Sequence, residues 1–257
     1  MAAYAEYKIE GKIAIVTGGG TGIGEACAIL LAQAGAKVAV FGRRMEPLEK
    51  VAAECGKYAE AMALSVDVSD EQAVRDGVDK VASAWGGVDI LINNAGIDLK
   101  VEMGEQRFET YFGTESAGEY MRYMAINSLG HYLMNNACIP YMQKKHFGRI
   151  VNISSILALT GIYSTPPYVA SKGASLTQTK SYAKRYGRDG ITVNAILPGM
   201  IDTPMKEDSP PEEYDIVASI TPLGRVGQPM DVARLALFLA QDDLFITGEG
   251  IAVTGGS

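Results

Sequence analysis

Cysteine is scarce in this sequence, and the few cysteines present are widely separated. Cys27, Cys55 and Cys138 form no CxxC pair. An odd, scattered set of thiols fits neither a disulfide framework nor a zinc site. We therefore expect no bound metal, and we expect all three thiols to be small buried side chains.

The sequence also lacks a long apolar run and an excess of positive charge. Its most apolar helical stretch, residues 26–36, is shorter than the ~20 residues that span a bilayer, and residues 1–10 contain no apolar core of a signal peptide. Lysine and arginine number 23 against 30 aspartates and glutamates, a formal net charge of −7, so no basic face is available for a phosphate backbone. We expect a cytoplasmic protein that binds neither nucleic acid nor a membrane.

Glycine, by contrast, is abundant. The chain has 29 glycines among 257 residues, or about 11% against an average near 7%. The glycines are not spaced at every third position, which excludes collagen, and a hydrophobic content of 47% excludes disorder. A chain of this length suits one large core, so the abundance of glycine needs a local explanation.

Short apolar runs alternate with longer amphipathic stretches along the chain. The early runs are apolar on both faces, as strands are when helices cover both sides of a sheet. This alternation predicts an α/β fold: one Rossmann-like domain over residues 1–257, with a doubly wound, seven-stranded parallel sheet and helices on both faces. The predicted strands are residues 13–17, 38–41, 63–66, 90–93, 150–153, 192–197 and 251–254. The predicted helices are residues 22–34, 47–54, 71–85, 120–145, 168–186 and 230–241.

Two connections, residues 97–119 and 200–222, are longer than such a fold usually needs. Both follow the carboxyl ends of predicted strands, the side on which open α/β sheets bind ligands. We expect both to be substrate loops, although a surface insertion without a role would look the same in the sequence.

A glycine-rich segment, T-G-G-G-T-G-I-G at residues 17–24, follows the first predicted strand directly. Glycines allow a sharp turn and bring backbone N–H groups close to a pyrophosphate at a helix N-terminus. The spacing is G-x-x-x-G-x-G and not the G-x-G-x-x-G dinucleotide fingerprint. A plain tight turn is an alternative, but the position after the first strand favours a dinucleotide site.

The end of the second predicted strand bears on the choice of cofactor. A carboxylate there would bind the ribose 2′-hydroxyl of NAD and repel a 2′-phosphate. This chain has Gly42 at that position, followed by Arg43 and Arg44, and guanidinium groups suit a phosphate dianion. The pattern favours NADP(H) over NAD(H); solvated arginines and a dual specificity are the alternative.

Tyr168 and Lys172 are spaced i, i+4, which places them on one face of a helix. An ammonium group close to a phenol lowers its pKa, so that the phenol can exchange a proton with an alcohol near neutral pH. Ser155 lies 13 residues earlier, after the strand at 150–153, where its hydroxyl can hold the substrate oxygen. Ser154 should point to the other face of the strand.

These motifs together resemble the classical short-chain dehydrogenase/reductase family, over nearly the whole chain. The elements that carry the resemblance are T-G-G-G-T-G-I-G at 17–24, Asp67-Val68, N-N-A-G at 93–96, Asn127, Ser155, Tyr168-x-x-x-Lys172, Pro198-Gly199 and Ile201-Asp202-Thr203. The chain departs from the family pattern in a longer segment before Asn127 and in the prolines at 166 and 167. Neither departure removes a catalytic group, but both alter the walls of the substrate pocket.

The resemblance implies a role for each matching residue. Tyr168 would be the general acid in ketone reduction and the base in alcohol oxidation, Ser155 would polarise the carbonyl, and Lys172 would bind the nicotinamide ribose and lower the tyrosine pKa. Asn127 would anchor a water that links Lys172 to solvent. The implied catalytic set is therefore Asn127, Ser155, Tyr168 and Lys172. With the two arginines, the cofactor-binding set is Gly18, Thr21, Gly22, Ile23, Gly24, Arg43, Arg44, Asp67, Val68, Asn94, Ala95, Gly96, Tyr168, Lys172, Pro198, Gly199, Ile201 and Thr203.

The expected activity is NADP(H)-dependent interconversion of a secondary alcohol and a ketone. The candidate pocket wall is largely apolar, which favours a hydrophobic, steroid-like or cyclic small-molecule substrate; its members are Leu157, Leu159, Tyr163, Met200, Met205 and Tyr214. The alternatives are a 3-oxoacyl-carrier-protein reductase, which would need a basic docking patch, and a non-catalytic NADP(H)-binding sensor or scaffold. The resemblance also implies a homotetramer or homodimer, paired through the helices predicted at 120–145 and 168–186.

Overall fold

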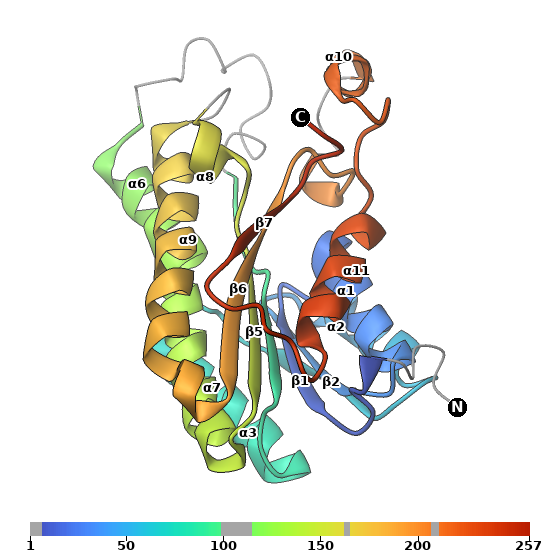
Figure 1. Ribbon diagram of the computed structural model, residues 1–257, viewed down its shortest axis with the longest axis vertical. Helices are drawn as coiled ribbons and strands as arrows, with labels where there is room; N and C mark the ends of the chain where they lie inside the picture. The colour runs from blue at the N-terminus through green and yellow to red at the C-terminus, as the bar shows by residue number, and fades with distance from the viewer. Residues whose placement is uncertain (1–6, 99–114, 162–164, 207–210) are drawn as a thin grey trace.

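The computed structural model describes residues 7–98, 115–161, 165–206 and 211–257. A parallel sheet with the strand order β3-β2-β1-β4-β5-β6-β7 forms its centre (Figure 1). The strands are β1 (Ile13–Thr17), β2 (Lys37–Gly42), β3 (Ala61–Ser65), β4 (Ile90–Asn93), β5 (Gly148–Ile153), β6 (Ile191–Pro198) and β7 (Gly250–Val253). The predicted Rossmann-like, doubly wound, seven-stranded fold is confirmed.

Helices cover both faces of the sheet, as Figure 1 shows. One face carries α1 (Gly22–Gln33), α2 (Met45–Cys55) and α11 (Pro229–Ala240). The other carries α3 (Glu71–Trp85), α6 (Ala117–Met124), α7 (Gly130–Lys145) and α9 (Pro166–Tyr186). An apolar core lies on each face of the sheet, between the strands and the helices. Because side chains alternate along a strand, β1 contributes to both: Ala14 and Val16 pack towards α1, while Ile13 and Ile15 pack on the opposite side.

The helix predicted at 120–145 is divided in the structure. Between α6 and α7 the backbone forms one π-helical stretch, η3 (Ala125–Leu129), which contains Asn127. Single π-turns inside α-helices occur often at functional sites. The sequence of this stretch, A-I-N-S-L, contains neither glycine nor proline, so the sequence alone could not locate this change of pitch.

The other boundaries differ by smaller amounts. The third strand is Ala61–Ser65 and not 63–66, because Val38 of β2 pairs with Ala61 in the parallel register. The connection predicted at 200–222 contains the 3-10 turn η5 (Pro204–Lys206) and α10 (Pro211–Ile220). The short helices α8 (Leu157–Thr160) and η4 (Gly187–Asp189) flank α9 in the sequence.

The three cysteines are free and buried, as expected.

The order of the strands determines where a ligand can bind. The strand order reverses at β1, which pairs with β2 on one side and with β4 on the other. Strands β2 and β3 therefore extend the sheet in one direction, and β4 to β7 extend it in the other. In open α/β sheets ligands bind at this switch point, beyond the carboxyl ends of the strands. In Figure 1, α8 and α10 lie above that end.

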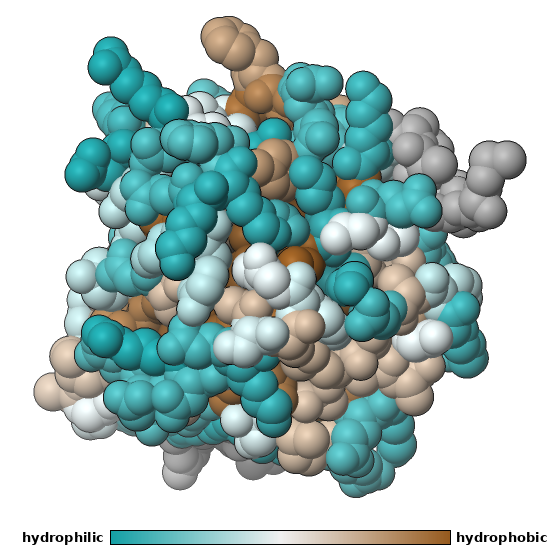
Figure 2. All heavy atoms as spheres, turned by 90° about the horizontal axis from the view of Figure 1, so that it is seen from below, coloured by the Kyte–Doolittle hydropathy of each residue, from teal (hydrophilic) through white to brown (hydrophobic). Residues whose placement is uncertain are grey.

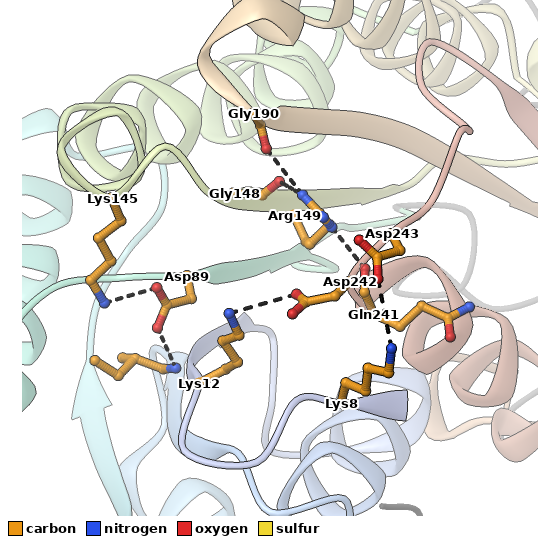
Figure 3. Close-up of polar contacts among 11 residues, drawn as sticks. Lys8, Lys12, Asp89, Lys145, Gly148, Arg149, Gly190, Gln241, Asp242 and Asp243 are labelled. Carbon is orange, nitrogen blue, oxygen red and sulfur yellow. Dashed lines mark hydrogen bonds and ion pairs between the residues drawn. The ribbon is translucent and has the colours of Figure 1, made fainter. Parts of the chain in front are cut away.

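The opposite end of the sheet is held by polar contacts (Figure 3). Asp89 accepts a hydrogen bond from the backbone N–H of Ile13 at 2.9 Å and pairs with Lys145 at 2.8 Å. Arg149 donates to the carbonyls of Gly148, Gly190 and Gln241. Seen from below, this side of the molecule carries hydrophilic side chains interspersed with apolar ones (Figure 2). None of the helices in the described ranges has the length and apolar character needed to cross a membrane.

Candidate active site

The glycine-rich turn connects β1 to α1 and is tightly packed. Gly18 has a φ of +62°, which favours glycine. A Cβ on Gly24 would lie 2.2 Å from the carbonyl oxygen of Gly18, so no larger residue fits there. Thr21 is the N-cap residue of α1, and its side chain makes no capping hydrogen bond. The turn therefore presents backbone N–H groups at a helix N-terminus, as an anion site requires.

Asn94 and Thr17 hold this turn against the end of β4. The hydroxyl of Thr17 accepts hydrogen bonds from the backbone N–H groups of Asn94 and Ala95, each at 3.0 Å. The side-chain amide of Asn94 donates to the carbonyls of Thr17 and Gly18, each at 3.1 Å. Asn94 thus lies beside the predicted cofactor site, with its side-chain N–H groups engaged in shaping the turn.

A cavity of about 180 Å³ lies beside this turn. The predicted cofactor residues Gly18, Thr21, Arg43, Arg44, Asp67, Val68, Ala95 and Gly96 line it. The apolar residues Pro47, Leu48, Val66, Ile97 and Ile126 line it too. No sequence motif pointed to these five, although each lies within a few residues of a predicted site residue along the chain or in an adjoining helix.

The two arginines and Asp67 meet at the same cavity. Burial raises the pKa of Asp67, but two hydrogen bonds from Ser69 and the charge of Arg43 outweigh burial, so the pKa lies below its usual value. A Cβ built on Gly42 would touch only the Leu48 side chain, at 3.3 Å. The end of β2 therefore presents positive charge and no carboxylate to the cavity.

Tyr168 lies in the first turn of α9, and Ser155 follows β5. Burial, and then the charge of Asp98, raises the pKa of Tyr168 above its usual range, while a hydrogen bond with Ser155 acts in the opposite direction. The Ser155 hydroxyl also accepts from the N–H of Leu157 at 3.2 Å. Ser154 points elsewhere, as predicted, and donates to the carbonyl of Lys172 at 2.9 Å. The structure thus brings Ser155 and Tyr168 together.

Lys172 lies one turn further along α9, with its ammonium 5.9 Å from the centre of the Tyr168 ring. Its Nζ donates to the carbonyl of Ile153 at 3.0 Å. Burial lowers the pKa of Lys172 to about 8, and the charge of Asp98 partly offsets this. The lowering of the Tyr168 pKa by Lys172 stays a prediction, since the raised pKa of Tyr168 arises from burial and from the charge of Asp98.

Asn127 uses its side chain to connect three segments. Its Oδ1 accepts from the N–H of Ile97 at 2.8 Å, and its Nδ2 donates to the carbonyl of Ile97 and the hydroxyl of Ser171, each at 3.0 Å. A Cβ on Gly96 would lie 3.2 Å from Oδ1 of Asn127 and 3.3 Å from Nζ of Lys172. The end of the N-N-A-G segment therefore packs directly against two predicted catalytic side chains.

The segment after β6 lies across the start of α1. Pro198 ends β6, and Gly199 donates to the carbonyl of Val253 at 3.0 Å. Ile201 is buried and bridges to Gly227. The methyl group of Thr203 lies 3.2 Å from a Cβ built on Gly22, so this segment flanks the glycine turn as the predictions require.

The substrate side of the site is described in part. Leu157 and Met200 are half-buried, and Leu159 and Met205 are exposed. Tyr214 donates to Asp202 at 3.3 Å. Tyr163 lies outside the described residues. Asp98 and Tyr123 belong to the neighbourhood of Tyr168 but were not predicted; the position of Asp98 two residues after N-N-A-G was the available signal.

Comparisons with known proteins place the chain among oxidoreductases. A family model described as enoyl-(acyl carrier protein) reductase matches residues 18–257. The 3-oxoacyl-[acyl-carrier-protein] reductase of Thermotoga maritima is 35% identical over 97% of this chain and 98% of its own. The meso-2,3-butanediol dehydrogenase of Serratia marcescens is 34% identical over 97% of this chain and 96% of its own.

A crystal structure of levodione reductase has the same architecture, with a TM-score of 0.88 and 31% identity over 96% of this chain and 98% of that one. Matches of this extent include the glycine turn, the strand ends and α9. The chain therefore belongs to the short-chain dehydrogenase/reductase family of oxidoreductases.

Proposed function

We propose that this protein is an NADP(H)-dependent oxidoreductase that interconverts a secondary alcohol and a ketone, with Tyr168 as the acid and base. The observation that carries the proposal is the position of Ser155, Tyr168 and Lys172 near the end of a cavity lined by glycine and arginine. Gly96 joins the two regions, since it lines the cavity and contacts Asn127 and Lys172.

The residues around the cavity fit a nicotinamide dinucleotide. Side chains are absent where a backbone must approach a phosphate, at Gly18, Gly20 and Gly96, and each of these glycines lines the cavity. The α1 N-terminus favours an anion. When bound, the cofactor supplies or accepts the hydride.

The protein's own contribution is binding and proton transfer. Ser155 donates a hydrogen bond to the substrate oxygen, which holds it against the Tyr168 hydroxyl. Because the pKa of Tyr168 is raised, the phenol is protonated near neutral pH and can donate its proton in the direction of reduction. Lys172, buried and close to the tyrosine ring, stabilises the negative charge that develops when the proton leaves.

The preference for NADP(H) is assigned to Arg43 and Arg44. Arg43→Ala is expected to raise the KM for NADPH about tenfold or more, with a smaller effect on NADH, because a charge-assisted hydrogen bond is worth about 1.5–3 kcal/mol. Gly42→Asp should move the preference further towards NADH, since only the flexible Leu48 side chain must shift. Arg75→Ala is the control, because Arg75 is exposed and pairs with Glu71 on α3. An unchanged KM for NADPH in Arg43→Ala would contradict the assignment.

The substrate class is proposed from the pocket wall and the relatives. Leu157 and Met200 provide apolar surface next to Ser155 and the end of β6, which favours a cyclic or otherwise hydrophobic ketone. The names of two similar proteins, a butanediol dehydrogenase and a levodione reductase, describe a small alcohol and a small ketone. The test follows NADPH oxidation with a panel of cyclic and acyclic ketones.

A second candidate is reduction of a 3-oxoacyl group on a carrier protein, because a relative of that name is 35% identical. An acetoacetyl group on a carrier protein is the discriminating substrate. The first candidate predicts a higher kcat/KM for a free cyclic ketone, and the second predicts a higher kcat/KM for the carrier-bound group.

We also propose that the protein acts as a homodimer or homotetramer. An aromatic side chain lies on the surface of α7: Tyr132 is 45% exposed, and its ring meets that of Tyr182 on α9. Exposed aromatic surface of this kind suits an interface. Sedimentation equilibrium tests this directly.

A further inference from the structure

Asp98 places a further carboxylate near the catalytic tyrosine. It follows residues 95–97, which line the cofactor cavity, and so stands where the chain leaves that cavity. No role for it follows from the motifs of the family resemblance. Its side chain is half-buried, which leaves it partly accessible.

Tyr123 fixes the carboxylate relative to the catalytic tyrosine. The hydroxyl of Tyr123 donates to Oδ1 of Asp98 at 3.3 Å. The ring of Tyr123 is fully buried and meets the ring of Tyr168 edge-on, with centroids 6.0 Å apart and an interplanar angle of 77°. Because Tyr123 contacts both residues, Asp98 and Tyr168 belong to one packed group.

The charge of Asp98 acts on both catalytic groups of α9. After burial, it is the next cause that raises the pKa of Tyr168. It also raises the pKa of Lys172, against the larger effect of burial. A carboxylate that acts on both groups, and that Tyr123 ties to the Tyr168 ring, is close enough to act on a substrate held by Ser155 and Tyr168.

We propose that Asp98 recognises a hydroxyl group on the carbon next to the reacting carbon, so that the preferred substrates are α-hydroxyketones and vicinal diols. This inference rests on the proposed function and narrows its substrate class. Asp98 accepts the hydrogen bond of that hydroxyl, while Ser155 and Tyr168 hold the reacting oxygen. The apolar wall at Leu157 and Met200 then contacts the rest of the molecule.

The surrounding charges favour a neutral hydroxyl over other groups. A substrate carboxylate would be repelled by Asp98 at short range. A substrate ammonium would attract Asp98 but would be repelled by Lys172, which is 5% exposed and lies in the same group. A hydroxyl can donate to the carboxylate without either repulsion, and a hydrogen bond to a charged group is among the stronger kinds.

The experiment compares two ketones that differ in one hydroxyl: cyclohexanone, and the hydroxycyclohexanone with its hydroxyl next to the carbonyl. The wild-type kcat/KM is expected to be at least about tenfold higher for the hydroxyketone, the effect of one charge-assisted hydrogen bond. Asp98→Ala should bring the ratio close to unity, mainly through the KM for the hydroxyketone. Asp98→Asn keeps the shape of the side chain and one acceptor oxygen, so it should give an intermediate ratio. This variant still tests the proposal if the alanine variant does not fold.

Asp79→Asn is the matched control, because Asp79 also accepts a hydrogen bond from a tyrosine, Tyr141, at 2.7 Å, but on the exposed surface of α3. It should leave the ratio unchanged. If Asp98→Ala lowers kcat/KM equally for both ketones, Asp98 only supports the position of Tyr168, and the proposed recognition is wrong. A wild-type ratio near unity would overturn it equally.

Failure of the proposed function has a different signature. In that case neither ketone is reduced with NADPH or NADH by any variant. Calorimetric binding of vicinal cyclohexanediol to the NADPH-saturated protein then decides the inference without turnover. Binding that Asp98→Ala weakens about tenfold supports recognition by Asp98, and equal or absent binding in both proteins rejects it.

Discussion

At the scale of single residues, burial sets the charge state of the site. Tyr168, Lys172 and His131 are titratable side chains in one region, and burial disfavours the charged form of each. The spacing of Tyr168 and Lys172 predicted that they would be close but not which shift would dominate. Desolvation depends on residues from several distant elements, and a helical pattern carries no information about them.

His131 gives a prediction about stability and pH. It is buried, its Nδ1 lies 2.8 Å from the hydroxyl of Ser175, and burial followed by the charge of Lys172 lowers its pKa from 6.5 to about 3. Below pH 6.5 the unfolded state binds a proton that the folded state does not, so stability falls as the pH decreases from 6.5 towards 3, by about 1.4 kcal/mol per pH unit.

The measurement is the free energy of unfolding in urea at neutral pH and at about pH 5. His131→Gln should lose less stability than the wild type on acidification, by roughly 2 kcal/mol. His146→Asn is the control, because His146 is exposed, and asparagine tolerates its φ of 47°. Equal acid sensitivity of wild type and His131→Gln would show that His131 is not the titrating group.

At the scale of elements, the sequence predicted each strand of the described sheet to within two residues and located the glycine turn, Ser155 and α9. It did not predict the π-helical stretch at Ala125–Leu129, because a π-turn differs from an α-helix in its backbone hydrogen bonds and this stretch has no glycine or proline to mark the change. It did not identify Asp98 and Tyr123, because their pairing joins a strand end to a helix 25 residues away. Short motifs report local geometry, whereas these features arise from tertiary packing.

The π-helical stretch should matter through Asn127. Asn127→Ala removes the partners of both backbone groups of Ile97, while the Ser171 hydroxyl loses one bond and keeps its bond to the carbonyl of Tyr168. Leaving buried polar groups without partners costs about 1–3 kcal/mol each, so we expect a loss of at least about 2 kcal/mol in unfolding free energy together with a lower kcat.

Urea denaturation and steady-state kinetics check this prediction on the same samples. Thr177→Ala on α9 serves as the control, because its hydroxyl bonds only within its own helix, to the carbonyl of Gly173, on the exposed side. If Asn127→Ala kept wild-type stability and kcat, the segment would not depend on this side chain.

At the scale of the whole molecule, one end of the sheet forms the candidate site and the other end holds stabilising polar contacts. The carboxyl ends of the strands carry the site, and the amino ends carry the contacts of Asp89, Lys145 and Arg149 (Figure 3). The net charge of the chain therefore does not predict the local charge at the site. The formal charge is −7, yet two arginines line the cofactor cavity.

Asp89 should contribute much more to stability than an exposed acidic residue does. Asp89→Ala leaves the Ile13 N–H and the Lys145 ammonium without their partner, and losing a hydrogen bond to a buried carboxylate costs about 1.5–3 kcal/mol. Glu46→Ala breaks an exposed pair with Lys50 and should leave the free energy of unfolding nearly unchanged. Both values come from urea unfolding, and similar losses in the two variants would contradict this account of the amino end.

The proposed role of Tyr168 is to transfer the proton in an NADP(H)-linked reduction of a ketone, and the Tyr168→Phe variant tests this role. Tyr182→Phe is the matched control, since Tyr182 lies on the same helix and its hydroxyl bonds to Asn136, outside the site. With a ketone that the wild type reduces, Tyr168→Phe should lower kcat about 10²–10⁴-fold, the usual contribution of a general acid, while the Kd for NADPH stays within about twofold and Tyr182→Phe keeps wild-type activity. A Tyr168→Phe variant that reduces the ketone at the wild-type rate would show that Tyr168 is not the proton donor.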